Sequence, residues 1–188
     1  MISESIKRSL YSSLLILVSG LVGCTDSRSP VAPAATPLKP VVLNETVQII
    51  EGQTLYVPVY SQIYTWAQDR TIDLTTTLSI RNTDAAHPLI LTAVDYYDGN
   101  GQLVRKYLEQ SVELGSLAAT NFVVPQTDAS GGLGAFFMVE WVTQIPVSDP
   151  VIESIMVNTS GNQGISFVSA GRVIRSRGAE DQEKSVEE

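Results

Sequence analysis

Three oxygen-bearing side chains that could coordinate calcium fall within one short stretch of the sequence. Asp95, Asp98 and Asn100 offer carboxylate and amide oxygens, which are the ligands that calcium prefers. An EF-hand loop also needs oxygen ligands at alternating positions and a distant bidentate Glu, and only fragments of that pattern are present. The run Asp98-Gly-Asn-Gly101 is instead typical of a hairpin turn, because Asn and Gly tolerate a positive φ. The sequence therefore predicts a turn here, and no metal site.

A glycine-rich segment, Ser130-Gly-Gly-Leu-Gly134, resembles part of a phosphate-binding loop. A P-loop needs a Lys and a Ser or Thr after its glycines, at the point where a helix begins. Here the residues that follow are Ala135-Phe-Phe-Met-Val139, which predict a strand. We therefore expect the glycines to provide a positive φ or to allow another backbone to approach closely.

The only histidine, His87, could join one of the many Ser and Asp residues in a catalytic triad. It directly precedes Pro88 in a predicted turn, however, and the sequence contains no G-x-S-x-G motif. We therefore expect His87 to be a solvent-exposed loop residue.

Two glutamates on separate predicted strands, Glu140 and Glu153, could form the carboxylate pair of a glycoside hydrolase. A carboxylate that alternates with Val139 and Trp141 along a strand is more typical of the solvent-facing side of a sheet. The sequence therefore favours a structural place for both glutamates.

Tyrosines could build a binding surface, because their side chains offer amphipathic contact area. Such residues also commonly line the faces and edges of sheets, so both interpretations stay open. The tyrosines concerned are Tyr56, Tyr60, Tyr64, Tyr96, Tyr97 and Tyr107.

All these side chains must be positioned by β-strands, because turn signals recur at short intervals and no segment shows a sustained helical periodicity. Pro58 cannot donate to a ladder, so its strand is expected at a sheet edge or a bulge. A short helix near Val112–Ala119 would also fit the pattern, although Gly115 disfavours it. The predicted strands are Thr54–Tyr60, Ile72–Asn82, Leu89–Asp98, Gln102–Leu108, Thr120–Val124, Ala135–Thr143, Val151–Val157 and Ile165–Ile174.

The strand spacing matches an antiparallel, immunoglobulin-like β-sandwich of about seven to nine strands. This all-β domain is expected to span residues 46–174. We expect its two layers to bury Leu78, Ile80, Ile90, Val94, Phe122, Phe137, Val139, Trp141, Ile155 and Phe167.

The N-terminus has the three parts of a lipoprotein signal peptide. Lys7 and Arg8 form a basic region, and the apolar run that follows is shorter than the roughly 20 residues of a transmembrane helix. The run ends in Leu21-Val22-Gly23-Cys24, which resembles the bacterial lipobox. We therefore predict that residues 1–23 are cleaved and that Cys24 carries the lipid. The alternative is an ordinary signal peptide with an incidental thiol.

A proline-rich tether and an acidic tail flank the predicted sandwich. Residues 24–45 contain Pro30, Pro33, Pro37 and Pro40, whose spacing disfavours a helix and favours an extended linker. Residues 175–188 are expected to form an acidic, disordered tail.

The overall composition excludes several classes of protein. The chain of 188 residues has a formal net charge of −8, whereas domains that bind nucleic acid carry basic patches. A single Cys rules out an internal disulfide or a CxxC centre, and a single His rules out a multi-histidine metal site. We therefore expect no nucleic acid partner, no cofactor and no metal.

Several stretches between residues 50 and 174 share their pattern with a known family. They are Tyr56-Val-Pro-Val-Tyr-Ser-Gln-Ile-Tyr64, Leu78-Ser-Ile-Arg-Asn-Thr-Asp84, Val94-Asp-Tyr-Tyr-Asp-Gly-Asn-Gly101, Leu103-Val-Arg105, Asp128-Ala-Ser-Gly-Gly-Leu-Gly134, Val139-Glu-Trp141 and Gln163-Gly-Ile-Ser-Phe-Val168. In these stretches the chain resembles an uncharacterised bacterial lipoprotein family, domain of unknown function 3124. The resemblance implies a secreted, single-domain β-protein and assigns no catalytic residue.

We interpret the chain as a membrane-anchored lipoprotein that acts as a binding or structural module in the cell envelope, rather than as an enzyme. It is expected on the periplasmic face of a membrane, with the outer membrane favoured because Thr25 rather than Asp follows Cys24. Its expected partners are the membrane, through the lipid, and another envelope protein or a glycan. The alternative is a carboxylate-dependent hydrolase that uses residues such as Asp95 and Glu140. The sequence identifies no ligand-binding residue.

Overall fold

The computed structural model describes residues 38–44, 47–161 and 164–178. The predicted signal peptide, Cys24, most of the proline-rich tether and residues 179–188 lie outside these described residues. Within the described part of the chain, no helix is long and apolar enough to cross a membrane.

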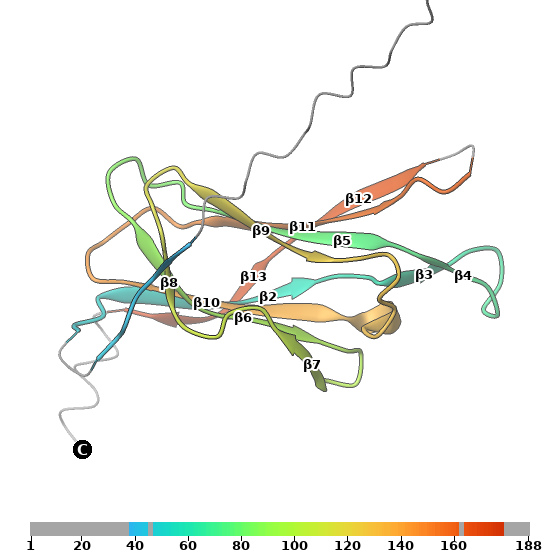
Figure 1. Cartoon of the computed structure of the whole chain (residues 1–188), viewed down its shortest axis with the longest axis horizontal. Helices are drawn as coiled ribbons and strands as arrows, with labels where there is room; N and C mark the ends of the chain where they lie inside the picture. Colours follow the sequence, from blue (N-terminus) through green and yellow to red (C-terminus); the bar gives the residue numbers. More distant parts are fainter. Residues whose placement is uncertain (1–37, 45–46, 162–163, 179–188) are drawn as a thin grey trace, which may run out of the picture. The chain divides into compact units, whose positions relative to one another are not determined.

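Two antiparallel sheets pack face to face as the layers of a sandwich, as Figure 1 shows. Along the larger sheet the strands follow the order β1 (Lys39–Pro40), β8 (Val112–Leu114), β6 (Leu89–Tyr97), β10 (Phe136–Thr143), β2 (Glu51–Pro58) and β13 (Arg172–Arg177), while β7 (Leu103–Lys106) also pairs with β6. Along the smaller sheet the order is β12 (Ile165–Ala170), β11 (Val151–Asn158), β5 (Thr75–Arg81) and β9 (Ala119–Val124). A separate hairpin pairs β3 (Gln62–Tyr64) with β4 (Thr71–Asp73).

The antiparallel β-sandwich predicted from the sequence is confirmed, and every predicted strand is present. The described residues contain 13 strands, more than the seven to nine expected. Three of them, β1, β3 and β8, were not predicted because they are too short to show an alternating pattern. Two predicted strands are also divided. The run 72–82 breaks at Leu74 between β4 and β5, and the run 165–174 breaks at Gly171 between β12 and β13.

Gly171 is the corner at which the chain passes from the smaller sheet to the larger one. Its backbone N–H donates to the carbonyl of Ile152 at 2.8 Å, and a Cβ at this position would lie 3.0 Å from that same oxygen. The absence of a side chain therefore permits the close approach that the corner requires. Strand β13 continues to Arg177, three residues beyond the predicted end of the domain at 174.

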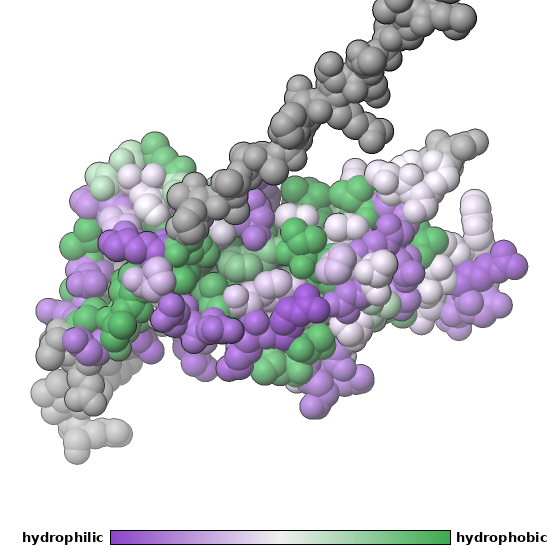
Figure 2. All heavy atoms as spheres, in the orientation of Figure 1, coloured by the Kyte–Doolittle hydropathy of each residue, from purple (hydrophilic) through white to green (hydrophobic). Residues whose placement is uncertain are grey.

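The core fills the space between the two sheets, and Figure 2 shows hydrophobic residues there, with hydrophilic residues along the larger sheet below. Phe122 and Phe167 are only half-buried, but both pack against the core. The other predicted core residues that are buried are Leu78, Ile80, Ile90, Val94, Phe137, Val139 and Trp141.

The prediction of a core position for Ile155 is wrong. On β11 the buried residues are Ile152, Ser154, Met156 and Asn158, whereas Ile155 is half-buried on the opposite side of the strand. The run Val151–Val157 has apolar residues at both alternating positions, so its pattern does not decide which side is buried. Pairing with the neighbouring strands decides it instead.

Two further expectations need correction. Strand β2 lies between β10 and β13 and is not an edge strand. It tolerates Pro58 because this residue ends the strand, beyond Tyr56, where the pairing with β13 stops. The possible helix near Val112–Ala119 is the strand β8, followed by a turn in which the Ala118 N–H donates to the Gly115 carbonyl at 3.1 Å.

Candidate functional site

A row of three aromatic side chains crosses the outward face of the larger sheet. Tyr56 on β2 stacks on Phe136 of β10 with ring centroids 4.6 Å apart, and Phe136 stacks on Tyr97 of β6 at 5.1 Å and 4° between planes. All three rings are half-buried, while Tyr96 and Phe137, their neighbours along the strands, are buried between the sheets. We call Tyr56, Phe136 and Tyr97 the aromatic row.

The other tyrosines do not join this row, so the structure brings together only two of the six that the sequence indicated. Tyr60 and Tyr107 pack against the core. Tyr96 is buried and shares a hydrogen bond of 2.6 Å with the Ser61 hydroxyl. Burial raises the pKa of Tyr96, which is consistent with a structural phenol that stays protonated.

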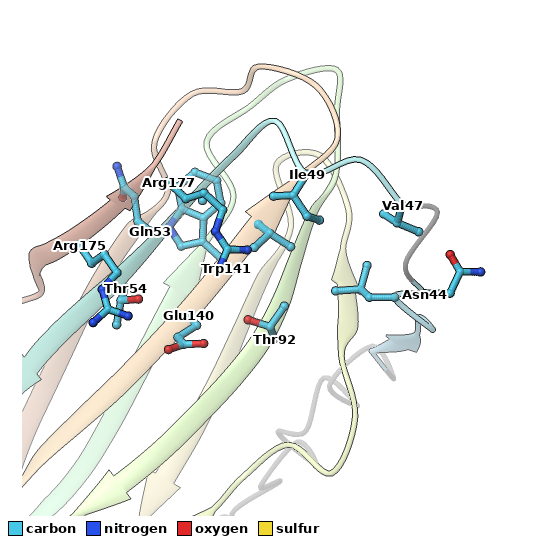
Figure 3. Close-up of a pocket in the computed structure, with 13 residues that line it drawn as sticks. Asn44, Val47, Ile49, Gln53, Thr54, Thr92, Glu140, Trp141, Arg175 and Arg177 are labelled. Carbon is cyan, nitrogen blue, oxygen red and sulfur yellow. The ribbon is translucent and has the colours of Figure 1, made fainter. Parts of the chain in front are cut away.

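A hollow of about 370 Å³ lies on the same outward face, nearer the other end of the strands. Arg175 and Arg177 of β13 stand on one side of it, and Glu140 of β10 stands on the other, as Figure 3 shows. We call this space the arginine hollow. The remaining lining residues are Leu43, Asn44, Val47, Ile49, Gly52, Gln53, Thr54, Thr92, Trp141 and Val142.

The strand register explains how these side chains meet. Residues that pair directly across an antiparallel sheet point to the same face. Arg175 pairs with Thr54, and Thr54 pairs with Glu140, so the three form one row across three strands. In the next row Arg177 pairs with Gly52, which has no side chain to fill the hollow.

Gly52 is required at this place for a second reason. A Cβ there would lie 2.7 Å from the backbone oxygen of Trp141, which is closer than real Cβ atoms approach. The close packing of β2 on β10 therefore excludes any larger residue, and the hollow remains open above the glycine.

A bulge places all three arginines of β13 on the outward face. Arg172 pairs with Tyr56 and Val173 with Leu55, but the register then shifts, and Arg175 pairs with Thr54. Without the extra residue, strict alternation would turn Arg175 and Arg172 to opposite faces. The sequence pattern alone did not predict this arrangement.

Within the part of the chain that the structure describes, the arginines of β13 have no acidic partner. Among the ion pairs that the described residues form, none includes Arg172, Arg175 or Arg177. Glu140 likewise takes part in none of the ion pairs among the described residues. Because the whole chain carries a net charge of −8, this strand concentrates positive charge on an otherwise acidic protein.

Trp141, which is one of the residues lining the hollow, carries a polar group that is buried. Its side chain is 1% exposed, and its indole Nε1 is buried without a hydrogen-bond partner among the described residues. Gln53, its register partner on β2, donates its own amide to Asp149 at 3.0 Å. An unpaired buried donor is uncommon in proteins, and this one belongs to a residue that lines the hollow.

The two glutamates predicted as a possible carboxylate pair lie on opposite sides of the sandwich, so that hypothesis is wrong. Glu140 faces outward from the larger sheet, whereas Glu153 faces outward from the smaller sheet and pairs with Arg81 at 3.0 Å. Asp95 does share the outward face with Glu140, on the neighbouring strand. It lines a different depression, beside Lys106.

Asp98 and Asn100, two of the three residues considered as calcium ligands, form the turn of the hairpin between β6 and β7. The Oδ1 atom of Asp98 accepts the backbone N–H of Asn100 at 2.9 Å and that of Gln102 at 2.8 Å. These hydrogen bonds lower the pKa of Asp98, and the bond from Gln102 has the largest effect. The predicted turn is confirmed, and no group of three His, Cys, Asp or Glu residues suited to a metal occurs in the described part of the chain.

The glycine-rich segment behaves as a tight loop, as predicted. Gly132 has φ of 65°, and a Cβ on Gly99 would lie 3.3 Å from the Cα of Gly134. Both expectations, a positive φ and a close backbone approach, are therefore confirmed. The segment forms a short 3-10 turn, Gly132–Gly134, instead of the helix start that a P-loop requires.

His87 lies in an exposed loop, as expected. Its Nδ1 is 3.3 Å from Asp84 Oδ1. No serine hydroxyl bonds to His87 among the described residues. Asp84 instead accepts the backbone N–H groups of Ala86, His87 and Ser148, which lower its pKa.

The architecture is thus an antiparallel β-sandwich whose larger sheet exposes an aromatic row and an arginine-lined hollow on one face. The chain belongs to the family described as "Protein of unknown function (DUF3124)", whose profile matches residues 52–174. The aromatic row and Glu140 fall inside that range, whereas Arg175 and Arg177 follow it.

Other comparisons add little. No curated protein matches the chain. Among solved structures, the crystal structure of Thermotoga maritima 1070 is similar over 64% of this chain and 92% of that chain, with 11% identity and a TM-score of 0.39.

Proposed function

We propose that the protein is a lipid-anchored binding module of the cell envelope, and that the outward face of the larger sheet is its contact surface. The observation that carries the binding role is the arginine hollow beside the aromatic row. Aromatic residues and arginine are the side chains most enriched where proteins bind partners. Here both types occur on one solvent-facing sheet surface.

The proposed anchor rests on the sequence of the N-terminus. Cys24 follows a basic region, an apolar run and a small residue, in the order that a lipoprotein signal peptide requires. A proline-rich linker up to residue 45 would then separate the lipid from the sandwich. Acyl chains would hold the domain at a membrane surface, because each buried methylene contributes about 0.8 kcal/mol.

Placement of the carboxylates supports binding over hydrolysis. The alternative hydrolase needs two carboxyl groups that flank one scissile bond. Glu140 and Glu153 lie on opposite faces, and Asp95 and Glu140 line separate depressions. The described residues therefore offer a surface with recognition groups more readily than a paired catalytic centre.

The anchor is tested by the substitution Cys24→Ala. We expect the wild-type protein to sediment with membranes and to incorporate radiolabelled palmitate, because the thiol receives the lipid. The variant should leave the membrane fraction and lose the label. A variant that still sediments and still labels would overturn the lipoprotein proposal.

The contact surface is tested by photo-cross-linking in intact cells. A photoreactive residue replaces Met138, which lies between Tyr56 and Asp95 on the outward face of the larger sheet. The matched control replaces Thr77, which faces outward from the smaller sheet. We expect discrete adducts from position 138 only. Equal adducts from both positions, or none from position 138, would contradict the proposed surface.

A further inference from the structure

Strand β13 is an edge strand with one open side. Among the described residues it pairs with β2 alone, and all six of its residues are exposed. Within the described residues its other side therefore presents backbone N–H and C=O groups that pair with no strand, and such groups can accept an additional strand. Recognition by strand addition uses such edges, with main-chain bonds for affinity and alternate side chains for specificity.

The charge of the β13 side chains determines which kind of strand could pair with this edge. Arg172, Arg175 and Arg177 all point to the outward face and have no acidic partner among the described residues. A second copy of β13 would bring like charges together, which is a common protection of edge strands. A strand with carboxylates on the same face would meet opposite charges.

From these observations we propose that β13 and the adjoining arginine hollow bind an extended, acidic polypeptide segment. The segment would extend the larger sheet by one strand, with carboxylates at alternate positions reaching Arg175 and Arg177. This inference rests on the proposed binding function and names the chemistry of the partner.

The hollow leaves the side chains of Arg175 and Arg177 uncovered on the outward face. Gly52, the register partner of Arg177, has no side chain, and Thr54, the register partner of Arg175, has a short one. Arginine binds carboxylates through two parallel N–H bonds. A carboxylated polysaccharide could also meet the arginines, but it has no backbone N–H and C=O groups with which to extend the sheet.

The experiment measures binding of synthetic peptides to the full chain in detergent solution. The first peptide has glutamate at every second position, separated by threonine, and carries a fluorescent label. The second has the same composition with its glutamates contiguous. The third is the alternating peptide with its backbone nitrogens methylated, which removes hydrogen-bond donors and keeps the charge. Polygalacturonate serves as the carboxylated polysaccharide.

We expect the alternating peptide to bind most tightly and the methylated peptide to lose most of its affinity. The double substitution Arg175→Gln and Arg177→Gln should weaken binding by about tenfold, the combined effect of two exposed ion pairs. The substitution Arg70→Gln is the control, because Arg70 is exposed in the loop between β3 and β4. It should leave the affinity unchanged.

Folding of the variants is checked by thermal melting, since Arg175 and Arg177 make no ion pair among the described residues and their loss should not alter stability. Binding of the contiguous or the methylated peptide as tightly as the alternating peptide would overturn strand addition. Tight, arginine-dependent binding of polygalacturonate without peptide binding would overturn a polypeptide partner. If no probe binds while adducts still form at position 138, this inference fails and the proposed function stands.

Discussion

At the scale of single residues, the buried hydroxyl of Tyr96 shapes the glycine-rich loop that packs against it. The phenol of Tyr96 is held between the sheets by the Ser61 hydroxyl, at 2.6 Å. Gly131 lies directly behind it, and any Cβ there would collide with the Tyr96 hydroxyl and with Ala135. The glycine-rich loop is therefore shaped by the buried tyrosine as well as by its own backbone.

Glycine-to-alanine substitutions in this loop should lower the free energy of unfolding by different amounts, because each glycine is needed for a different reason. We expect Gly131→Ala to lower the free energy of unfolding by about 2 kcal/mol or more, because overpacking forces its neighbours to move. Gly132→Ala should cost about 1 kcal/mol, because φ of 65° is unfavourable for alanine. Gly115→Ala is the control, since open space surrounds that position. Urea melts measure all three variants, and neutral results for both Gly131→Ala and Gly132→Ala would make the loop a simple spacer.

Asn82 is a second residue on which local structure depends. It is buried, and its Nδ2 approaches the carbonyls of His87, Leu114 and Gly115 at 2.8, 3.2 and 3.0 Å. Its Oδ1 accepts the N–H of Asp84 at 2.9 Å. One side chain thus joins the loop after β5 to the end of β8.

The substitution Asn82→Ala should therefore be strongly destabilising. We expect a loss of about 3 kcal/mol in the free energy of unfolding, because buried carbonyl groups would be left without donors. Asn121→Ala, at an exposed position on β9, is the matched control and should change stability by less than about 0.5 kcal/mol. A loss of similar size in both variants, measured by urea denaturation, would contradict this account.

At the scale of elements, aspartates at the turns organise the connections between strands. Asp84 and Asp98 accept backbone N–H groups in their own loops, and Asp128 accepts the hydroxyl and the N–H of Ser130. Arg105 of β7 also donates to Asp128 at 2.8 Å. These bonds favour the ionised carboxylates and lower the pKa of all three aspartates below the ordinary value of 3.8.

This pattern predicts loss of stability in acid. A carboxyl whose pKa is lower in the folded state binds protons more tightly when unfolded, so its stabilisation is complete above the unfolded pKa and fades as pH falls below about 4. We expect urea midpoints to be constant near neutral pH and to fall towards about pH 3. The triple variant Asp84→Asn, Asp98→Asn, Asp128→Asn should be less stable at neutral pH and should show a flatter acid dependence. An unchanged slope would contradict the assignment.

At the scale of the whole molecule, the described sandwich is stabilised by packing between its two sheets, and no group of three metal-ligating side chains occurs among the described residues. Chelation with EDTA should therefore leave the thermal midpoint unchanged, because Asp98 and Asn100 are engaged in their own turn. Differential scanning calorimetry with and without EDTA measures this. A drop of several degrees that calcium restores would instead support a site around Asp95.

Much of the fold follows from local patterns that the sequence displays. The alternation in β5 predicted that Leu78 and Ile80 are buried, and both are. The Asp98-Gly-Asn-Gly101 run predicted its hairpin, and the glycines after Ser130 predicted a positive φ. Each of these depends on the conformational preferences of neighbouring residues, which are properties of the chain itself.

The candidate site could not be predicted in the same way. The aromatic row, the arginine hollow and the separation of Glu140 from Glu153 depend on which strands pair and which sheet each strand joins. Composition places Arg175 and Arg177 in the predicted tail, although the arginines at 172, 175 and 177 form a basic run that sets them apart from the acidic residues that follow. Their common face results from a bulge that alternation does not reveal.

By itself, then, the sequence determined the class of domain, the positions of its strands and turns, and the expectation of a lipid on Cys24. These follow from short-range periodicity, turn chemistry and a contiguous signal. Only the tertiary structure decided that Ile155 faces outward, that Tyr96 is buried, and that β13 joins the larger sheet. The physical reason is that burial and register are set by contacts between residues far apart in the chain, which no local pattern encodes.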